Sequence, residues 1–251
     1  MAARADTAFA QARLQARHAA LPDAQAWHVV EASRTSAHYL ALARKGPLAR
    51  WVDGLDDAAD VHRVEEGLRS RWRRYVDEVA RWQPAPWREA TRWFGVLVEL
   101  PLVAGLLRGD PRARGAWPAL PPNADPGARA DALRSAGLAP FAVAAQAGGA
   151  QAMAAIWLAD WRRRLPPGAD SDRALRLPAE CLVPRLRDAA GERATAGEPL
   201  RRALVRLFRR HAFSPVAAYA HLALVALDVE RLRGGVAARA PIDSVPPRGG
   251  A

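Results

Sequence analysis

The sequence has almost no cysteine and no visible export signal. Cys181 is the single cysteine among 251 residues, so no disulfide can form within the chain. Residues 1–20 carry arginines and Asp6 and contain no apolar run, so we expect no secretory signal peptide. Together these absences favour a cytosolic or peripheral protein.

Strand-forming runs are also scarce. Runs of Val, Ile and Thr are almost absent, whereas alanine is abundant and apolar residues recur at steps of three and four, which predicts an all-α fold. Half of the residues are apolar, which excludes global disorder, and the length is ample for a buried core. We therefore expect a multi-helix bundle built from helical hairpins in two lobes.

Lysine is nearly missing, so the net charge of +11 comes from arginine: Lys45 is the single lysine among 37 basic residues. An excess of arginine together with alanine is what genome-wide codon bias produces without selection for function. The charge still favours an anionic neighbour, such as nucleic acid, an acidic protein face or lipid headgroups. Acidic residues are interspersed through most of the chain, however, so the pattern favours a solvated mixed surface.

The common signatures of catalysis and metal binding are missing as well. The sequence has no glycine-rich phosphate loop after a strand and no HExxH, CxxC or GxSxG pattern. Two pairs of histidines are ten residues apart, namely His28 with His38 and His211 with His221. That spacing places the members of a pair about three helical turns apart, too far for one metal ion. We therefore predict no catalytic residues, no metal, no cofactor and no small-molecule substrate.

Residues 60–109 carry the strongest pattern and contain four of the nine tryptophans. Apolar residues recur at helical spacing through residues 61–82, with Trp72 at the centre of the stripe, and again through residues 87–106. Two prolines between the stripes must end the first helix, because proline lacks a donor N–H and disfavours helix in the residue before it. We predict a hairpin of two long helices, the second kinked at Pro101.

Two apolar stretches come nearest to a membrane span, and we expect neither to insert. Residues 136–159 are uncharged but consist mostly of alanine and glycine, which makes them too weakly apolar. Residues 94–107 are too short and contain Glu99.

Proline and glycine are concentrated between residues 110 and 127, which predicts a linker. This linker separates a predicted N-terminal lobe (1–109), which holds the long hairpin, from a predicted C-terminal lobe (128–233). The glycine-rich residues 234–251 are expected to form a disordered tail.

Residues 198–212 predict a helix with two contrasting faces. Its apolar residues fall on one side and its arginines on the other, and the arginines are Arg201, Arg202, Arg206, Arg209 and Arg210. We predict that these arginines, with Arg108 at the end of the hairpin, form a partner interface. The face lacks interleaved aromatics for base stacking and follows no helix-turn-helix pattern, so it does not favour nucleic acid. Ser214 followed by Pro215 predicts the start of the next helix.

Several segments have a recognisable order along the chain. They are Phe9-Ala10-Gln11-Ala12-Arg13-Leu14 through Ala20-Leu21, Glu31-Ala32-Ser33 before Tyr39-Leu40-Ala41-Leu42, Glu99 before Leu106-Leu107-Arg108-Gly109, and Tyr219-Ala220-His221-Leu222 before Asp228-Val229-Glu230-Arg231-Leu232-Arg233. Taken together they resemble the C/d family of V-type ATPase subunits. The matched positions are Arg13, Glu99, Arg108, Tyr219, Glu230 and Arg231. Pro101 and Leu102 depart from the family pattern, because the asparagine of its Asn-Leu-x-x-x-Leu-Arg ending is missing.

The resemblance implies a non-catalytic helical subunit of a proton- or sodium-translocating ATPase, which couples the central stalk to the membrane rotor ring. Its partners would be the stalk and rotor-ring subunits, and it would lie in the cytoplasm, peripheral to the inner membrane. It would bind no cofactor. The residues alone leave two alternatives open: a basic all-α adaptor or nucleic-acid-associated protein, and an all-α enzyme of unrecognised type.

Overall fold

A computed structural model describes residues 2–56, 60–110, 117, 120–121, 123–147, 152–169, 173–187 and 197–239. Over these residues the secondary structure is helical and contains no strand, which confirms the all-α prediction. The α-helices are α1 (Ala2–Ala19), α2 (Ala24–Glu31), α3 (Ser36–Arg44), α4 (Ala49–Val52), α5 (Val61–Trp82), α6 (Arg88–Trp93), α7 (Leu100–Arg108), α9 (Pro126–Ser135), α10 (Ala142–Ala147), α11 (Met153–Arg163), α12 (Arg173–Arg187), α13 (Gly197–Arg210) and α14 (Pro215–Ala237). Short 3₁₀ helices occupy Ala85–Trp87, Phe94–Glu99 and Ala139–Phe141.

The helices pack into two compact units whose segments alternate along the chain. The first unit holds Met1–Ala19 and Trp72–Leu227, and the second holds Ala20–Arg71 and Asp228–Ala251. Helices α5 and α14 each contribute one half to each unit. The predicted lobes 1–109 and 128–233 are therefore not confirmed, because α7 and α9, which lie before and after the predicted linker, pack against each other within the first unit.

Helix ends follow the local chemistry of the sequence. The Asp23 carboxylate accepts the N–H of Ala26 at the start of α2, and the hydroxyl of Ser214 accepts the N–H of Val216 at the start of α14. Pro215 is the first residue of α14, where its missing N–H costs no helical hydrogen bond. The predicted start after Ser214 is thus confirmed.

The second arm of the predicted hairpin is one helical stretch, Ala85–Arg108, that alternates between 3₁₀ and α geometry. Helix α6 passes into the 3₁₀ helix Phe94–Glu99, and α7 begins at Leu100. Pro101 lies in the first turn of α7, directly after the 3₁₀ segment, where proline is tolerated. The predicted second helical arm is therefore present, with its irregular segment just before Pro101.

Trp72 joins the two arms. Its side chain is fully buried, and its indole N–H lies 3.2 Å from the carbonyl oxygen of Phe94 and 3.1 Å from that of Gly95. Close by, the Arg73 guanidinium lies 3.3 Å from the carboxylate of Glu99. The central tryptophan of the α5 stripe therefore also supplies a donor to the 3₁₀ helix, which fixes the register of the two arms.

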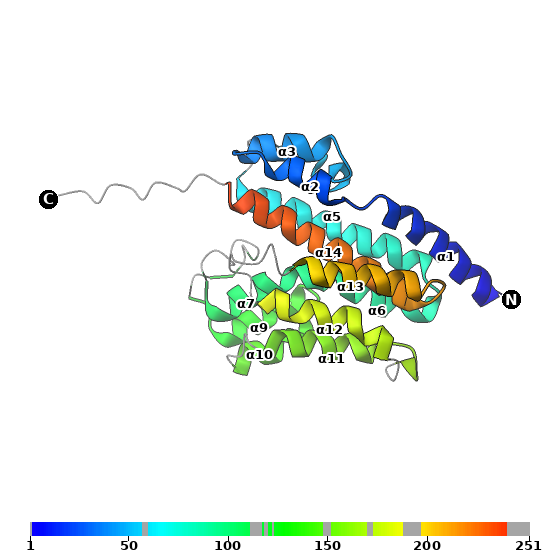
Figure 1. Ribbon diagram of the computed structural model, residues 1–251. Helices are drawn as coiled ribbons and strands as arrows, with labels where there is room; N and C mark the ends of the chain where they lie inside the picture. Colours follow the sequence, from blue (N-terminus) through cyan, green and yellow to red (C-terminus); the bar gives the residue numbers. More distant parts are fainter. Residues whose placement is uncertain are drawn as a thin grey trace. The chain divides into compact units, whose positions relative to one another are not determined.

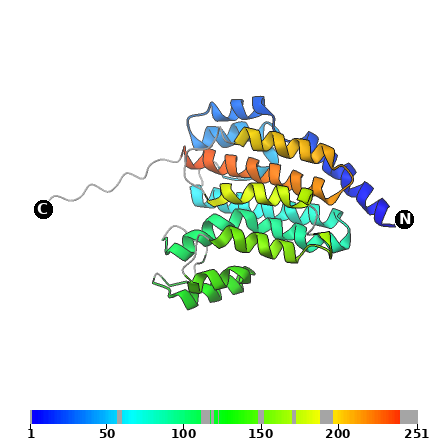
Figure 2. The same cartoon turned by 60° about the horizontal axis from the view of Figure 1, so that its bottom comes forward.

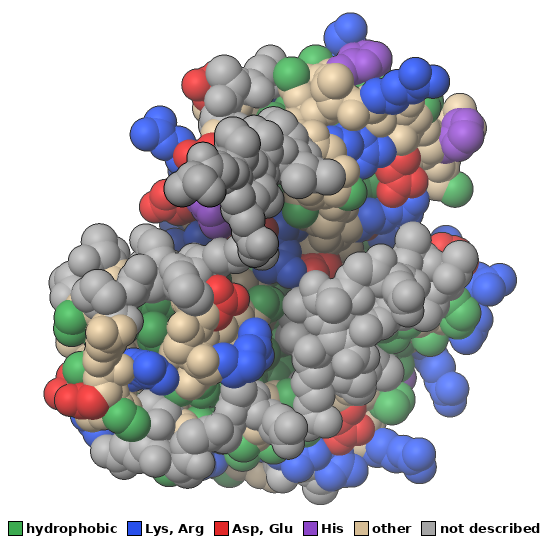
Figure 3. Space-filling model, turned by 90° about the vertical axis from the view of Figure 1, so that its left-hand side faces the viewer, with side chains coloured by type: hydrophobic (Ala, Val, Ile, Leu, Met, Phe, Trp, Pro, Cys, Tyr) green, Lys and Arg blue, Asp and Glu red, His purple; other side chains and the backbone are tan. Residues whose placement is uncertain are grey.

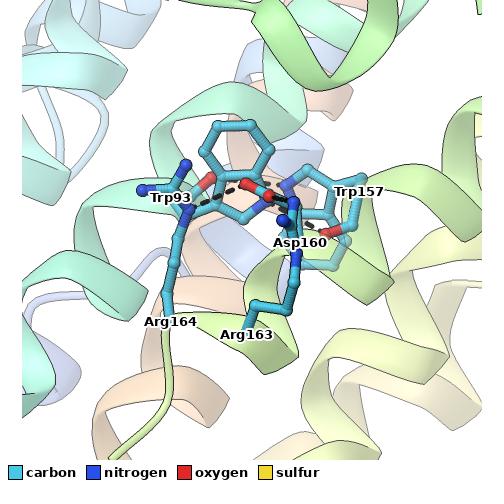
Figure 4. Close-up of polar contacts among 5 residues, drawn as sticks. All are labelled: Trp93, Trp157, Asp160, Arg163 and Arg164. Atoms are coloured by element: carbon cyan, nitrogen blue, oxygen red, sulfur yellow. Dashed lines mark hydrogen bonds and ion pairs between the residues drawn. The ribbon is translucent and has the colours of Figure 1, made fainter. Parts of the chain in front are cut away.

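Aromatic side chains fill the core of the first unit. The indole of Trp93 donates to the carbonyl of Trp157 at 3.0 Å, and the indole of Trp157 donates back to the carbonyl of Trp93 at 3.3 Å, as Figure 4 shows. This reciprocal pair ties α6 to α11. The ring of Phe94 then packs against Trp157, Trp161 and Tyr219 at centroid distances of 5.4, 5.9 and 5.0 Å. In Figure 1 helix α11 runs beside α12, and the two are in contact.

The second unit contains α2, α3 and α4 with the first half of α5 and the end of α14. Figures 1 and 2 show α2 and α3 side by side. Tyr39 on α3 is fully buried, and a Cβ placed on Gly235 would lie well under 3.0 Å from its hydroxyl oxygen. Glycine is therefore required at position 235 for α14 to approach α3.

The boundary of the predicted tail needs a correction. We expected a disordered segment from residue 234, but α14 continues through Gly234 and Gly235 to Ala237. The continuation is held by Arg239, whose guanidinium donates to the carbonyls of Glu31, Ser33 and Gly235 and lies 4.6 Å from the ring centroid of Tyr39. Residues 240–251 lie outside the described part of the chain.

One helical stretch meets the criteria of length and composition for a membrane span. It runs from Ala85 to Arg108 over 24 residues, and 61% of its most apolar window is buried inside the protein. A buried core helix meets the same criteria, so the stretch is weak support for membrane insertion.

Candidate functional site

Helix α13 presents its arginines to solvent. Leu204 and Phe208 are buried on the inner side of the helix. Arg202, Arg206, Arg209 and Arg210 are exposed on the outer side, and Arg201 is half-buried. The spacing of apolar residues at three and four positions is what divides the helix in this way. The predicted two-faced character of residues 198–212 is confirmed.

The exposed face of α13 carries little compensating charge. Arg202 lies 3.9 Å from Glu198, and both side chains are more than 60% exposed, so the pair contributes little to stability. Arg206, Arg209 and Arg210 form no ion pair with other described residues. This outer face is called the arginine face below, defined as Arg201, Arg202, Arg206, Arg209 and Arg210.

Elsewhere the charges are mixed. On the side of the molecule shown in Figure 3, basic side chains are scattered over the described surface and acidic side chains lie among them. Several arginines are paired, for example Arg17 with Glu78 at 2.8 Å and Arg92 with Asp77 at 3.1 Å. The arginine face differs from these places because, among the described residues, Glu198 alone forms an ion pair with it.

Behind the arginine face lies a small group of aromatic rings. His18 of α1 stacks on Phe208 of α13, with ring centroids 4.0 Å apart and planes 19° apart. The ring of His221 on α14 lies 6.2 Å from that of His18, and the Tyr75 hydroxyl lies 2.5 Å from Nε2 of His221. Burial lowers the pKa of His18 below its usual 6.5, and the charges of Arg209 and then Arg201 lower it further. The positive potential of the arginine face therefore reaches a titratable group beneath it.

Arg108 lies on a different helix from the other predicted interface residues. It is exposed at the end of α7 and forms no ion pair with the described residues, and Gly109 caps the helix with a φ of 75°. Helix α12 packs against both α7 and α13. Arg108 is thus available to a partner, but the structure does not join it to the arginine face.

The positions matched to the V-type ATPase family mostly make contacts within this chain. Tyr219 is fully buried in the aromatic core, and burial raises the pKa of its phenol far above the usual value of 10.0. The remaining matched positions, apart from Arg108, have charged or aromatic neighbours: Arg13 lies over the rings of Phe9 and Trp82, Glu99 pairs with Arg73, Glu230 with Arg233, and Arg231 with Glu31. These contacts give the positions a part in folding, whatever else they do.

Sequence reasoning missed two polar clusters. In the first unit, the nearly buried carboxylate of Asp160 pairs with Arg163 and, at 2.8 Å, with Arg164, which covers the ring of Trp93 (Figure 4). Its spacing of three and four residues is a signal that could have been read. In the second unit, Arg231 binds both carboxylate oxygens of Glu31 at 2.6 and 2.7 Å. That pair is 200 residues apart and has no local signal.

Neither cluster has the composition of a catalytic or metal site. In both clusters the carboxylates are held by guanidinium groups. Among the residues that the structure describes, no group of three or more His, Cys, Asp or Glu side chains could hold a metal ion. The arginine face with the rings behind it is therefore the best candidate for a functional site in this chain.

Comparisons with known proteins add no relative. No protein-family model matches the chain, and neither a curated protein nor a solved structure shows significant similarity to it. The resemblance to the V-type ATPase family therefore rests on the short segments quoted above and remains a hypothesis.

Proposed function

We propose that this protein is a non-catalytic helical subunit of a V-type ATPase, and that it couples the central stalk to the membrane rotor ring by binding partner subunits through the arginine face of α13. The ordered segments that resemble the family motivate the choice of complex. The observation that carries the choice of surface is that Arg206, Arg209 and Arg210 are exposed and form no ion pair with other described residues, on a helix whose other side is buried in the core.

The arginine face suits an acidic protein surface. Arginine offers five N–H donors in a planar fork, so it can bind a carboxylate through two parallel hydrogen bonds. It is also less strongly hydrated than lysine, so less free energy is lost when a partner excludes water. Because Leu204 and Phe208 anchor the inner side of α13, the arginines extend from a rigid helix rather than a loop. A protein that couples stalk to ring needs this stiffness, since it transmits force and performs no chemistry.

The surface is tested by reversing charges on it. Arg206→Glu with Arg209→Glu should abolish recovery of ATPase subunits when the tagged protein is pulled down with solubilised membranes from its own cells. Both side chains are exposed, so circular dichroism and thermal melting should remain close to those of the wild type.

A matched control keeps the charge change but moves it elsewhere. Arg34→Glu with Arg63→Glu reverses two exposed arginines that make no ion pair with the described residues. Arg34 lies in the loop before α3, and Arg63 lies on α5. This control should still recover the ATPase subunits. If both double variants assemble, the arginine face is not the interface, and if the wild type recovers no ATPase subunit, the proposed complex is wrong.

Nucleic acid is the competing anionic partner, and the same variants decide it. Under the proposed function, binding of random-sequence DNA should be weak and should disappear near physiological salt, because it rests on few phosphate contacts. Sub-micromolar DNA binding at that salt, lost on Arg206→Glu with Arg209→Glu, would instead support the nucleic-acid-associated alternative.

A further inference from the structure

The imidazole of His18 lies on the inner side of the helix whose outer side carries the arginine face. Its ring is stacked on Phe208, which is fully buried, and its edge lies against the ring of His221, which is also fully buried. The Nδ1 atom of His18 is enclosed and has no hydrogen-bond partner among the described residues. A proton on this ring would therefore be poorly solvated.

The groups that face His18 come from three helices besides its own. Helix α13 contributes the guanidinium groups of Arg201 and Arg209, α14 contributes the imidazole of His221, and α5 contributes the Tyr75 hydroxyl bound to His221. The two guanidinium groups are positive, so they oppose an additional positive charge on the His18 imidazole. Burial opposes it more strongly still, and together these effects keep the pKa of His18 below 6.5 in the free protein.

An acidic partner would change this balance. Carboxylates that bind the exposed Arg209 cancel positive potential that this side chain exerts on His18, so the imidazole takes up a proton more readily in the complex. Coupling between two binding events is reciprocal, and a proton that binds the complex more tightly than the free protein must in turn tighten the complex. No movement of the helices is needed for this effect.

We infer that His18 makes binding at the arginine face proton-dependent, so that a carboxylate-rich protein partner binds more tightly as the medium is acidified. The inference rests on the proposed function only in taking an acidic protein as the occupant of the arginine face. It adds that the site responds to pH through a residue that does not touch the partner.

The direct test is an NMR titration of the His18 ring in the full-length protein. Poly-L-glutamate serves as the probe, because its side chains stay mostly ionised down to about pH 5.5. The His18 ring signals, assigned with His18→Gln, should titrate below 6.5 in the free protein and at a higher pH when the probe is present. An unchanged titration midpoint in the saturated complex would overturn the inference.

The second test measures affinity for the same probe at low salt. Acidification from about pH 7.5 to about pH 5.5 should tighten wild-type binding about fivefold, which is the low end of ordinary coupling factors. His18→Gln should bind the probe at about pH 7.5 like the wild type but lose most of this pH dependence. His211 is a half-buried histidine just after α13, so His211→Gln serves as the matched control and should keep most of the dependence. Equal pH dependence in wild type and His18→Gln would contradict the inference.

The outcomes separate this inference from the proposed function. If the wild type recovers ATPase subunits from cells but the pH dependence of its affinity for the probe does not require His18, only the proposed proton dependence is refuted. If the pH dependence of probe binding requires His18 but no ATPase subunit is recovered, the pH-sensitive site for an acidic partner is supported and the proposed complex is refuted.

Discussion

Replacing Trp72 with alanine tests the packing of residues 60–109 most sharply, because this one side chain contacts both arms. Its ring is fully buried, and deleting a buried aromatic costs about 3–5 kcal/mol. The substitution also removes the donor shared by the carbonyls of Phe94 and Gly95, which adds about 1 kcal/mol. We expect Trp72→Ala to lower the free energy of unfolding by about 4–6 kcal/mol.

A second substitution at the same position separates packing from hydrogen bonding. Trp72→Phe keeps much of the ring volume and removes only the N–H donor and part of the packing, so it should cost about 1–3 kcal/mol. Urea unfolding followed by circular dichroism measures both variants without relying on tryptophan fluorescence. Trp87→Ala is the control, since Trp87 is only partly buried on the 3₁₀ helix Ala85–Trp87. A Trp72→Ala protein that unfolds like Trp87→Ala would refute the reasoning.

Two further outcomes follow from particular contacts. Gly235→Ala should lower the melting temperature, because the new Cβ would lie well under 3.0 Å from the Tyr39 hydroxyl. Gly234→Ala should be neutral or stabilising, because no atom lies within 4 Å of its Cβ. Equal melting temperatures of the two variants would contradict the close packing of α14 on α3. The pKa of His18 is lower in the folded protein than in the unfolded chain, so the unfolded chain takes up the proton first and stability should fall as the pH drops below 6.5. His18→Gln should reduce this loss of stability, whereas His62→Gln, at an exposed site, should not. Thermal melts across that pH range measure both variants.

Local chemistry made much of the fold predictable from the sequence. Helix starts at Asp23 and Ser214 depend on a side chain bonding a backbone N–H two or three residues away, so the signal is contained in a few letters. The burial of Trp72 and the two faces of α13 follow from helical spacing within one element. The arginine face was therefore visible before the structure.

Contacts between distant segments were not predictable in this way. The Trp93–Trp157 pair and the Glu31–Arg231 pair join residues 64 and 200 positions apart, and neither has a pattern in its own helix that names its partner. Gly234 and Gly235 suggested the end of a helix, because glycine commonly ends helices. At position 235 glycine instead permits a close approach to Tyr39, and sequence alone does not distinguish these two uses.

The position of His18 behind the arginine face was equally unpredictable. Nothing near residue 18 indicates that its ring stacks on Phe208, which is far along the chain and on another helix. The charged face could be predicted, whereas the nearby histidine whose pKa this face lowers could not.

The most direct test of the proposed function asks what touches the arginine face in living cells. A photo-crosslinking amino acid placed at position 206 should be joined, on irradiation, to a stalk or rotor-ring subunit of a V-type ATPase, identified by mass spectrometry. The same amino acid at position 63, exposed on another element, should give no such product. Crosslinks from position 206 to nucleic acid, or to proteins that belong to no ATPase, would contradict the proposal.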